Sequence, residues 1–141
     1  MSVITLSREA YSGGTVLAEA LARNIDCRLV TREDFSAIFR DYGLVSFEQF
    51  YESPLTIWER LDEFQNDYMN FLIKVTLHLG ALGNCVILGR GCFAALNDYR
   101  DAFHIRVWAP QEARIQRCMK EESIGEEKAR SMVQTLDRNR S

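Results

Sequence analysis

The chain has 141 residues, of which 47% are hydrophobic and 26% charged, and a formal net charge of −3. This composition is typical of an ordinary globular protein, and we expect residues 1–141 to form a single domain with a buried core. A slightly acidic chain has no broad positive field for nucleic acid or an anionic membrane, so we expect neither as a partner. The four cysteines are scattered and there are two histidines, which favours reduced thiols and a cytoplasmic location over a metal or disulfide framework.

The N-terminal segment reads as a strand, a turn and a helix. A β-branched apolar run at 3–6 is followed by a polar turn with Gly13 and Gly14, and Thr15 opens the helix. Backbone N–H groups at such a turn, together with the helix dipole, favour a bound phosphate. The P-loop pattern G-x-x-x-x-G-K-[ST] is half met, because Thr15 matches the metal-binding hydroxyl while Gly14 replaces the lysine and Arg8 the first glycine. Taken alone, the segment is equally consistent with an ordinary glycine turn.

The rest of the chain alternates between strand-like and helix-like segments. We expect strands at 27–30, 85–88 and 103–108, and helices at 31–39, 45–53, 54–82, 92–96, 110–120 and 123–136. Thr31 and Ser123 are the expected N-caps, with Ser123 in a capping box with Glu126. The apolar residues of 54–82 recur at steps of three and four, which predicts a core-facing stripe. Alternating strands and helices predict an α/β fold in three layers, a parallel sheet with helices on both faces.

Candidate ligand-binding arginines follow the predicted strands. Ligands of open α/β sheets bind at the carboxyl ends of the strands, where Arg8 and Arg90 would both lie. Arg90 stands between two glycines directly after an apolar run, so its guanidinium could bind a phosphate that approaches the backbone closely. We favour this interpretation over a surface salt bridge. Read on their own, Arg114, Arg117 and Arg138 are most simply solvated charges.

Together these segments resemble the cytidylate kinase-like family of P-loop nucleoside-monophosphate kinases. The residues that carry the resemblance are 4–9, 12–14, 86–91, 107–117, 123–127 and 137–140. The resemblance covers nearly the whole chain in the family's order. It implies a P-loop NTPase-like fold of the nucleotide-kinase type and phosphoryl transfer from ATP, with Mg²⁺, to a nucleoside monophosphate such as cytidylate.

The resemblance also implies roles for individual residues. The donor phosphates would be held by the first loop: Arg8, Ser12, Gly13, Gly14 and Thr15, with Thr15 also a ligand of Mg²⁺. The acceptor nucleotide would be bound by two arginines, Arg32 and Arg90. The transferred phosphoryl group would be contacted by arginines of a mobile lid: Arg114, Arg117 and Arg138. Such positive charge, together with in-line positioning, is what phosphoryl transfer requires.

The chain departs from the family pattern at several positions. Tyr11 stands where the family has glycine and Thr15 where it has arginine, and the loop contains no lysine. A tyrosine tolerates left-handed backbone poorly, and we expect its ring to crowd the phosphate cradle. Thr31 replaces an aspartate expected in the acceptor-base region. The sequence stops at Ser141, before the family's last strand, so we expect either a fragment or a short form whose open sheet edge favours a homodimer.

Three hypotheses therefore remain open. The chain is an active nucleoside-monophosphate kinase, a related module that binds a nucleotide or phosphate without turnover, or a P-loop-like scaffold stabilised as an oligomer. The retained arginines favour the first two hypotheses, whereas Tyr11, Thr15 and the early end favour the second over the first. A Tyr11 ring that fills the loop would count against both binding hypotheses. His104 and Arg106, inside a predicted strand, are expected to be structural.

Overall fold

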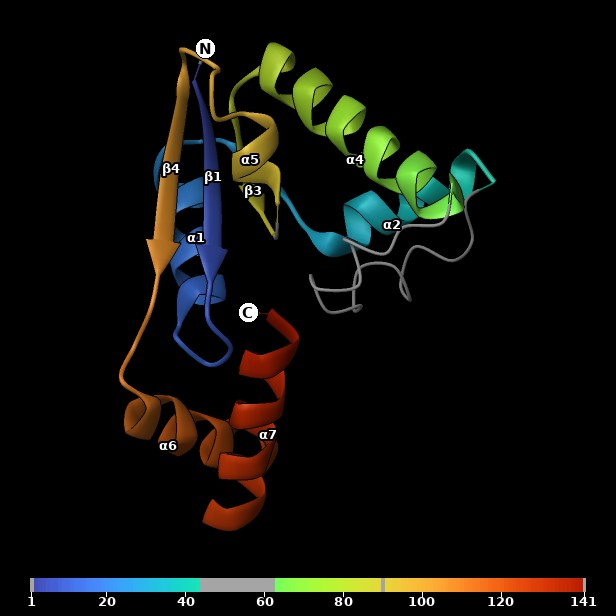
Figure 1. The fold of residues 1–141 in the computed structure, drawn as a ribbon. Coiled ribbons are helices and arrows are strands. Elements are labelled where there is room, and N and C mark those ends of the chain that lie inside the picture. Colours follow the sequence, from blue (N-terminus) through green and yellow to red (C-terminus); the bar gives the residue numbers. More distant parts are fainter. Residues whose placement is uncertain (1, 44–62, 90, 141) are drawn as a thin grey trace.

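The computed structural model describes residues 2–43, 63–89 and 91–140 (Figure 1). In chain order its elements are β1 (Val3–Arg8), α1 (Gly14–Asn24), β2 (Arg28–Val30), α2 (Arg32–Asp41), α4 (Glu63–Leu82), β3 (Cys85–Leu88), α5 (Cys92–Ala95), β4 (Ala102–Val107), α6 (Gln111–Glu122) and α7 (Glu126–Arg140). The helix expected at 45–53, the start of the helix expected at 54–82 and Arg90 lie outside the described residues.

Within the described residues, four strands form one parallel sheet in the order β2-β3-β1-β4. β3 and β1 are the inner strands, and all four residues of β3 are buried, as its continuous apolar run predicts. α1 covers one face of the sheet, and α2, α4 and α5 cover the other (Figure 1). The predicted α/β fold, with a parallel sheet between two helical layers, is confirmed.

Side chains that alternate along the strands supply the two halves of the core. On one face, Leu6, Val86 and Leu88 pack on the small residues Ala18 and Ala22 of α1, which lets the helix approach the sheet closely. The other face packs on side chains of α2, α4 and α5 and on the residue that follows α5: Phe35, Phe39, Tyr68, Leu72, Leu79, Cys92 and Leu96. Tyr68, Leu72 and Leu79 belong to the apolar stripe predicted for the long helix, so that stripe is core, as expected.

One predicted cap is confirmed and one is wrong. Thr31 precedes α2, and its backbone N–H donates to Asp34 Oδ2 at 2.7 Å. Ser123, in contrast, is the C-cap of α6 and has a left-handed φ of 53°. The carbonyl oxygen of Gly125 accepts the hydrogen bond from Ala129 N at 3.0 Å, so α7 begins at Glu126 without the Ser123 capping box.

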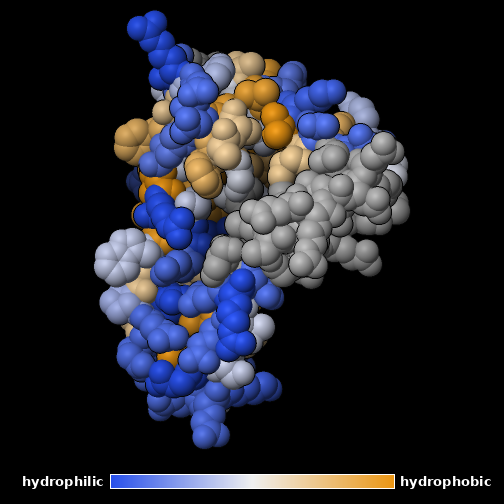
Figure 2. Space-filling view, in the orientation of Figure 1, coloured by the Kyte–Doolittle hydropathy of each residue, from blue (hydrophilic) through white to orange (hydrophobic). Residues whose placement is uncertain are grey.

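The helices α6 and α7 form a hairpin beyond the carboxyl ends of β1 and β4 (Figure 1). The hairpin has a small core of its own, made of Ile115, Cys118, Ala129 and Val133. Its outer surface is mainly hydrophilic (Figure 2). The hairpin thus lies at the sheet edge where α/β domains bind ligands.

β4 is an edge strand of the described sheet. His104, predicted to be structural, contacts the buried Thr5 through a 2.7 Å hydrogen bond between Nδ1 and Oγ1. Among the described residues, no helix is both long enough and apolar enough to cross a membrane.

Candidate functional site

The segment between β1 and α1 forms a compact turn at the carboxyl edge of the sheet. Its first residue, Glu9, donates its backbone N–H to Val107 O at 3.1 Å, which extends the pairing of β1 with β4. The carbonyl oxygen of Glu9 accepts hydrogen bonds from Ser12 Oγ at 2.8 Å and Ser12 N at 3.3 Å. The Ser12 hydroxyl therefore closes the turn. The first N–H groups of α1 have no acceptor within the helix, so they form a positive end next to this turn.

Two glycines are required at the start of α1 for different reasons. Gly13, the N-cap, has a φ of 86°, which a side chain adopts only with strain. Gly14 has no such conformation, but a Cβ added there would lie 2.4 Å from Arg8 Cβ. The stem of Arg8 and the side chain of Val107 therefore occupy the space where a side chain at position 14 would begin.

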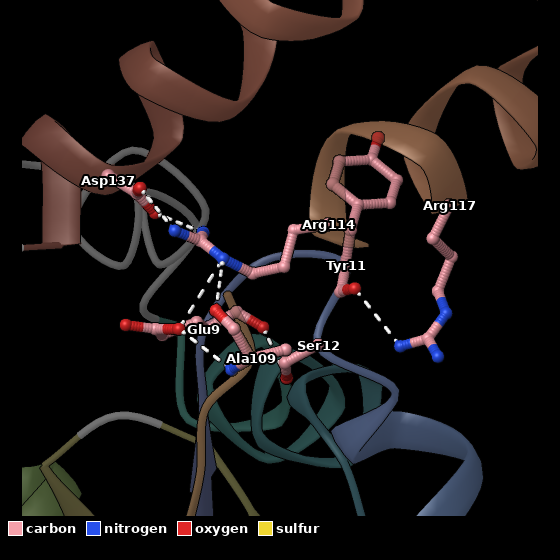
Figure 3. A network of polar contacts seen from close by, with 7 residues as sticks. All are labelled: Glu9, Tyr11, Ser12, Ala109, Arg114, Arg117 and Asp137. Carbon is pink, nitrogen blue, oxygen red and sulfur yellow. Dashed lines mark hydrogen bonds and ion pairs between the residues drawn. The ribbon is translucent and has the colours of Figure 1, made fainter. Parts of the chain in front are cut away.

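Tyr11 points away from the phosphate cradle that the sequence predicts. Its hydroxyl donates to Glu122 Oε1 at 2.8 Å, and its ring packs against the core of the α6–α7 hairpin. Figure 3 shows the ring directed away from Ser12. Burial, followed by the hydrogen bond with Glu122, raises the pKa of the Tyr11 phenol. The backbone of Tyr11 has a left-handed φ of 58°, a conformation that the glycine of the family pattern would adopt without strain. The expectation that the ring crowds the loop is therefore wrong.

The guanidinium of Arg117 lies over the loop instead. Arg117 Nη1 donates to the Tyr11 carbonyl oxygen at 3.1 Å (Figure 3), and a Cβ added at Gly13 would lie 2.6 Å from the same nitrogen. Within the described part of the chain, Arg117 forms no ion pair with a carboxylate. Its positive charge is therefore available beside the N-terminus of α1.

Arg114 differs from Arg117, although one helix carries both. Arg114 Nη1 and Nη2 donate to the two carboxylate oxygens of Asp137 at 2.8 and 2.9 Å, and its Nε donates to Ala109 O at 3.1 Å. Its Nε also lies 3.4 Å from Glu9 Oε2, and its side chain is only 6% exposed. The interpretation of Arg114 as a solvated charge is wrong, because the guanidinium ties the loop, α6 and α7 together (Figure 3).

Carboxylates also account for the electrostatics of Arg114. The hydrogen bonds that Arg114 donates to Asp137, together with the negative charges of Asp137 and Glu9, raise the pKa of the guanidinium against the opposing effect of burial. Glu9 is held from a second side, since its Oε2 accepts the backbone N–H of Ala109 at 3.2 Å. The charge of Arg114 is thus neutralised within the protein.

The other predicted site residues surround the same edge. Thr15 is exposed in the first turn of α1, and Arg32 is the partly buried first residue of α2, directly after β2. Arg138 is exposed on α7, next to Asp137. The C-terminal end of α7 comes back toward the β1–α1 loop (Figure 1). Glu9 and Asp137 carry no sequence signal for their roles, because their contacts with Arg114 join distant parts of the chain that no local spacing relates.

Fold and site together define a P-loop-like α/β domain. It consists of a parallel sheet, a glycine turn before α1 and a helical hairpin that carries arginines at the carboxyl edge of the sheet. The chain belongs to the cytidylate kinase-like family, whose model matches residues 3–141. It is therefore a kinase-like, nucleotide-binding module by class.

Two solved structures share the fold. An uncharacterized protein from Eubacterium ventriosum ATCC 27560 matches with a TM-score of 0.68 and 22% identity, over 97% of this chain and 71% of that one. TT1252 from Thermus thermophilus matches with a TM-score of 0.54 and 16% identity, over 99% of this chain and 80% of that one. No curated protein matches the sequence. At these identities the two structures bear on the fold alone.

Proposed function

We propose that this protein transfers a phosphoryl group from ATP to a nucleoside monophosphate of the cytidylate type. The main support is the position of Arg117, whose guanidinium has no carboxylate partner among the described residues and lies over Gly13. The ring of Tyr11 lies outside the loop, packed on the hairpin core. A triphosphate at the start of α1 would meet backbone N–H groups, the positive end of the helix and this guanidinium.

The contacts of the other candidate arginines suggest two different roles, binding of substrate and positioning of the hairpin. Arg138 is exposed beside Asp137 and would contact the transferred phosphoryl group. Arg32, after β2, and Arg90, outside the described residues, would bind the acceptor phosphate. Arg114 already donates to a carboxylate with two nitrogens, so we assign it a positioning role rather than a contact with substrate.

The donor set of this edge fits a weakly held Mg²⁺. The described residues contain no cluster of three or more His, Cys, Asp or Glu side chains that could hold a metal. Mg²⁺ in kinases keeps several waters and relies on phosphate oxygens, so it needs few direct protein ligands. The exposed hydroxyl of Thr15 would supply one. When bound, the ion would neutralise charge on the transferred and leaving phosphates.

A second candidate function, nucleotide or phosphate binding without turnover, is favoured by a different observation. The loop has no lysine, and Gly14, at the lysine position of the P-loop pattern, is packed against Arg8. Arg114 is neutralised by carboxylates. Less positive charge would then stabilise the transition state than in a kinase with a complete P-loop.

The two functions are separated by measuring binding and turnover on one sample. We would titrate ATP and then cytidine monophosphate by calorimetry, with Mg²⁺ at low salt, and follow ADP release in a coupled assay. Binding with turnover is the expected result, whereas binding without turnover would leave the second candidate. If neither nucleotide binds, both candidates are rejected.

Gly13→Ala tests where the nucleotide binds. The added methyl group would meet Arg117 Nη1, so we expect ATP affinity to fall at least about tenfold. Gly43→Ala is the matched control, because Gly43 also has a positive φ, 77°, but no described residue lies within 4 Å of a Cβ added there. Equal losses in the two variants would place the nucleotide elsewhere.

A further inference from the structure

We propose that Arg117 and Tyr11 together replace the lysine that this loop lacks. Arg117 supplies the cation that contacts the donor phosphates, and Tyr11 is the positioning residue that keeps it over the loop. This inference rests on the proposed function, and it assigns a specific part of the donor site to two residues of this chain.

The loop itself has no room for a cation at the position where the pattern places one. A side chain at Gly14 would collide with Arg8 Cβ at 2.4 Å and Arg8 Cγ at 2.9 Å. The next residue, Thr15, is neutral. A positive charge at the start of α1 must therefore come from another element.

Arg117 is the hairpin arginine whose contacts fit this role. Arg114 binds Asp137 with two nitrogens, and Arg130 does the same with Glu112 at 2.8 and 3.2 Å. Arg117, in contrast, donates to a backbone carbonyl, and none of the described carboxylates neutralises it. A guanidinium in this state keeps most of its N–H groups and its full charge for an anion.

Tyr11 contacts α6 both through its backbone carbonyl and through the hydroxyl at the end of its side chain. Its carbonyl oxygen accepts from Arg117, while its hydroxyl donates to Glu122 near the end of the helix. Between these contacts the ring packs on the core of the hairpin, beside residues such as Ile115 and Cys118. The loop residue and the helix are thus joined by a hydrogen bond at each end and an apolar contact between them.

The backbone of Tyr11 points to the same role. A φ of 58° is uncommon for a bulky residue and persists only where surrounding contacts hold it. Glycine would adopt this conformation freely but would have no ring to hold α6 against the loop. A tyrosine at this position therefore adopts an unfavourable backbone conformation, and its contacts with α6 hold Arg117 at a fixed distance from the loop.

The phosphate contact is tested with inorganic tripolyphosphate, which carries the donor phosphates without a base. Calorimetry at low salt should show a Kd about 10- to 100-fold higher for Arg117→Ala than for the unmodified protein, as for a lost charge-assisted hydrogen bond. Arg130→Ala removes the same charge from the same hairpin, but from a guanidinium already bound by Glu112 and Glu126, and should stay within about threefold. An unchanged Kd in Arg117→Ala, or an equal loss in Arg130→Ala, would overturn the assignment.

The positioning role is tested with two substitutions at Tyr11. Tyr11→Gly keeps the backbone conformation accessible and loses the ring, so tripolyphosphate affinity should fall about tenfold, and adding Arg117→Ala should lower it little further. Tyr11→Phe keeps the ring and should restore affinity to within about threefold. Fully additive losses in the double variant would show that Tyr11 does not act through Arg117.

The positioning role of Tyr11 can also be measured without a ligand, by NMR of the Arg117 side chain. The Nε–Hε resonance of Arg117, identified by its loss in Arg117→Ala, should be unchanged in Tyr11→Phe and should move toward that of a free arginine in Tyr11→Gly. An identical resonance in Tyr11→Gly would overturn the positioning role.

The outcomes separate this inference from the proposed function. An unmodified protein that binds neither tripolyphosphate nor ATP contradicts both. An unmodified protein that binds both, with Arg117→Ala binding equally well, contradicts this inference alone.

Discussion

At the scale of single residues, Gly14 illustrates how a position in the first turn of a helix is set by other elements. It is buried, and the side chains of Arg8 in β1 and Val107 in β4 lie where its Cβ would be. Its backbone does not need a positive φ, so close packing rather than conformational freedom accounts for the glycine. The requirement comes from the approach of α1 to the sheet.

We therefore expect Gly14→Ala to lower the free energy of unfolding. A methyl group 2.4 Å from Arg8 Cβ forces the helix or the strand to move, at a cost of about 1–3 kcal/mol. The neighbouring Thr15→Ala is exposed and should change the free energy of unfolding by less than about 0.5 kcal/mol. Urea denaturation of both variants checks this, and equal stabilities would show that the start of α1 adapts.

Cys92 predicts a pH dependence of stability. Burial raises the pKa of its thiol from 9.0 to about 11, against a smaller opposite effect of the hydrogen bond with Thr76. The pKa of the thiol is higher in the folded state than in the unfolded state. The stability that the neutral buried thiol contributes is therefore complete below pH 9.0 and is lost as the pH rises toward about 11. Above both pKa values, the free energy of unfolding should be lower by about 2–3 kcal/mol.

The control for Cys92 is Cys92→Ala. This variant should be less stable at every pH, because a buried side chain is shortened, but should lose less on going from pH 8 to pH 11. Urea melts across that range measure the difference. Parallel curves for the two proteins would assign the alkaline loss to other groups.

At the scale of elements, the α6–α7 hairpin has a small core of its own, and it contacts the β1–α1 loop through polar side chains and the ring of Tyr11. Arg114 makes the central one, because it binds Asp137 of α7, the carbonyl of Ala109 and the carboxylate of Glu9. Tyr11 makes the second, through Glu122 and the ring. The position of the hairpin over the loop therefore depends on a few side chains.

Replacing Arg114 with methionine should loosen the hairpin and destabilise the fold. The change leaves the carboxylates of Glu9 and Asp137 without this partner, but both are about one-third exposed, so we expect a loss of about 1–3 kcal/mol rather than the larger value of a fully buried pair. Amide hydrogen exchange should become faster near Asp137.

Arg130→Met is the matched comparison for Arg114→Met. Arg130 also binds a carboxylate bidentately, but at the surface, where ion pairs contribute little. The stability and the exchange near Asp137 should be almost unchanged. A loss as large as that of Arg114→Met would mean that the hairpin, not its attachment, limits stability.

At the scale of the whole molecule, the proposed site joins the end of β1, the start of α1 and the hairpin. A ligand there would contact elements that otherwise meet through Tyr11, Glu9 and Arg114. Binding to the folded state alone should stabilise the protein by about 2.7 kcal/mol at a ligand concentration 100 times Kd.

We accordingly expect ATP and tripolyphosphate to raise the melting temperature by several degrees, in a concentration-dependent way. Gly13→Ala should remove most of this shift, and Gly43→Ala should retain it, since only the first places a methyl group against Arg117. Differential scanning calorimetry provides the measurement. A shift that survives in Gly13→Ala would point to a site away from the loop.

Much of this protein follows from its sequence alone. Local patterns define the strands at 85–88 and near 3–8, the Thr31 cap and the apolar stripe of the long helix, because propensity, periodicity and capping act between near neighbours. The order of motifs along the chain also indicates the family that the match over residues 3–141 shows. The parallel sheet follows from the alternation of strands and helices.

The tertiary structure alone decided which charges remain available and where Tyr11 points. Arg114 and Arg117 occupy one helix, yet the first is neutralised by Glu9 and Asp137 and the second lies over Gly13. The same holds for Ser123, whose capping pattern gives way to the turn that folds α7 back on α6. Charge pairing and side-chain direction depend on which distant segments meet, and no local spacing in the chain records that.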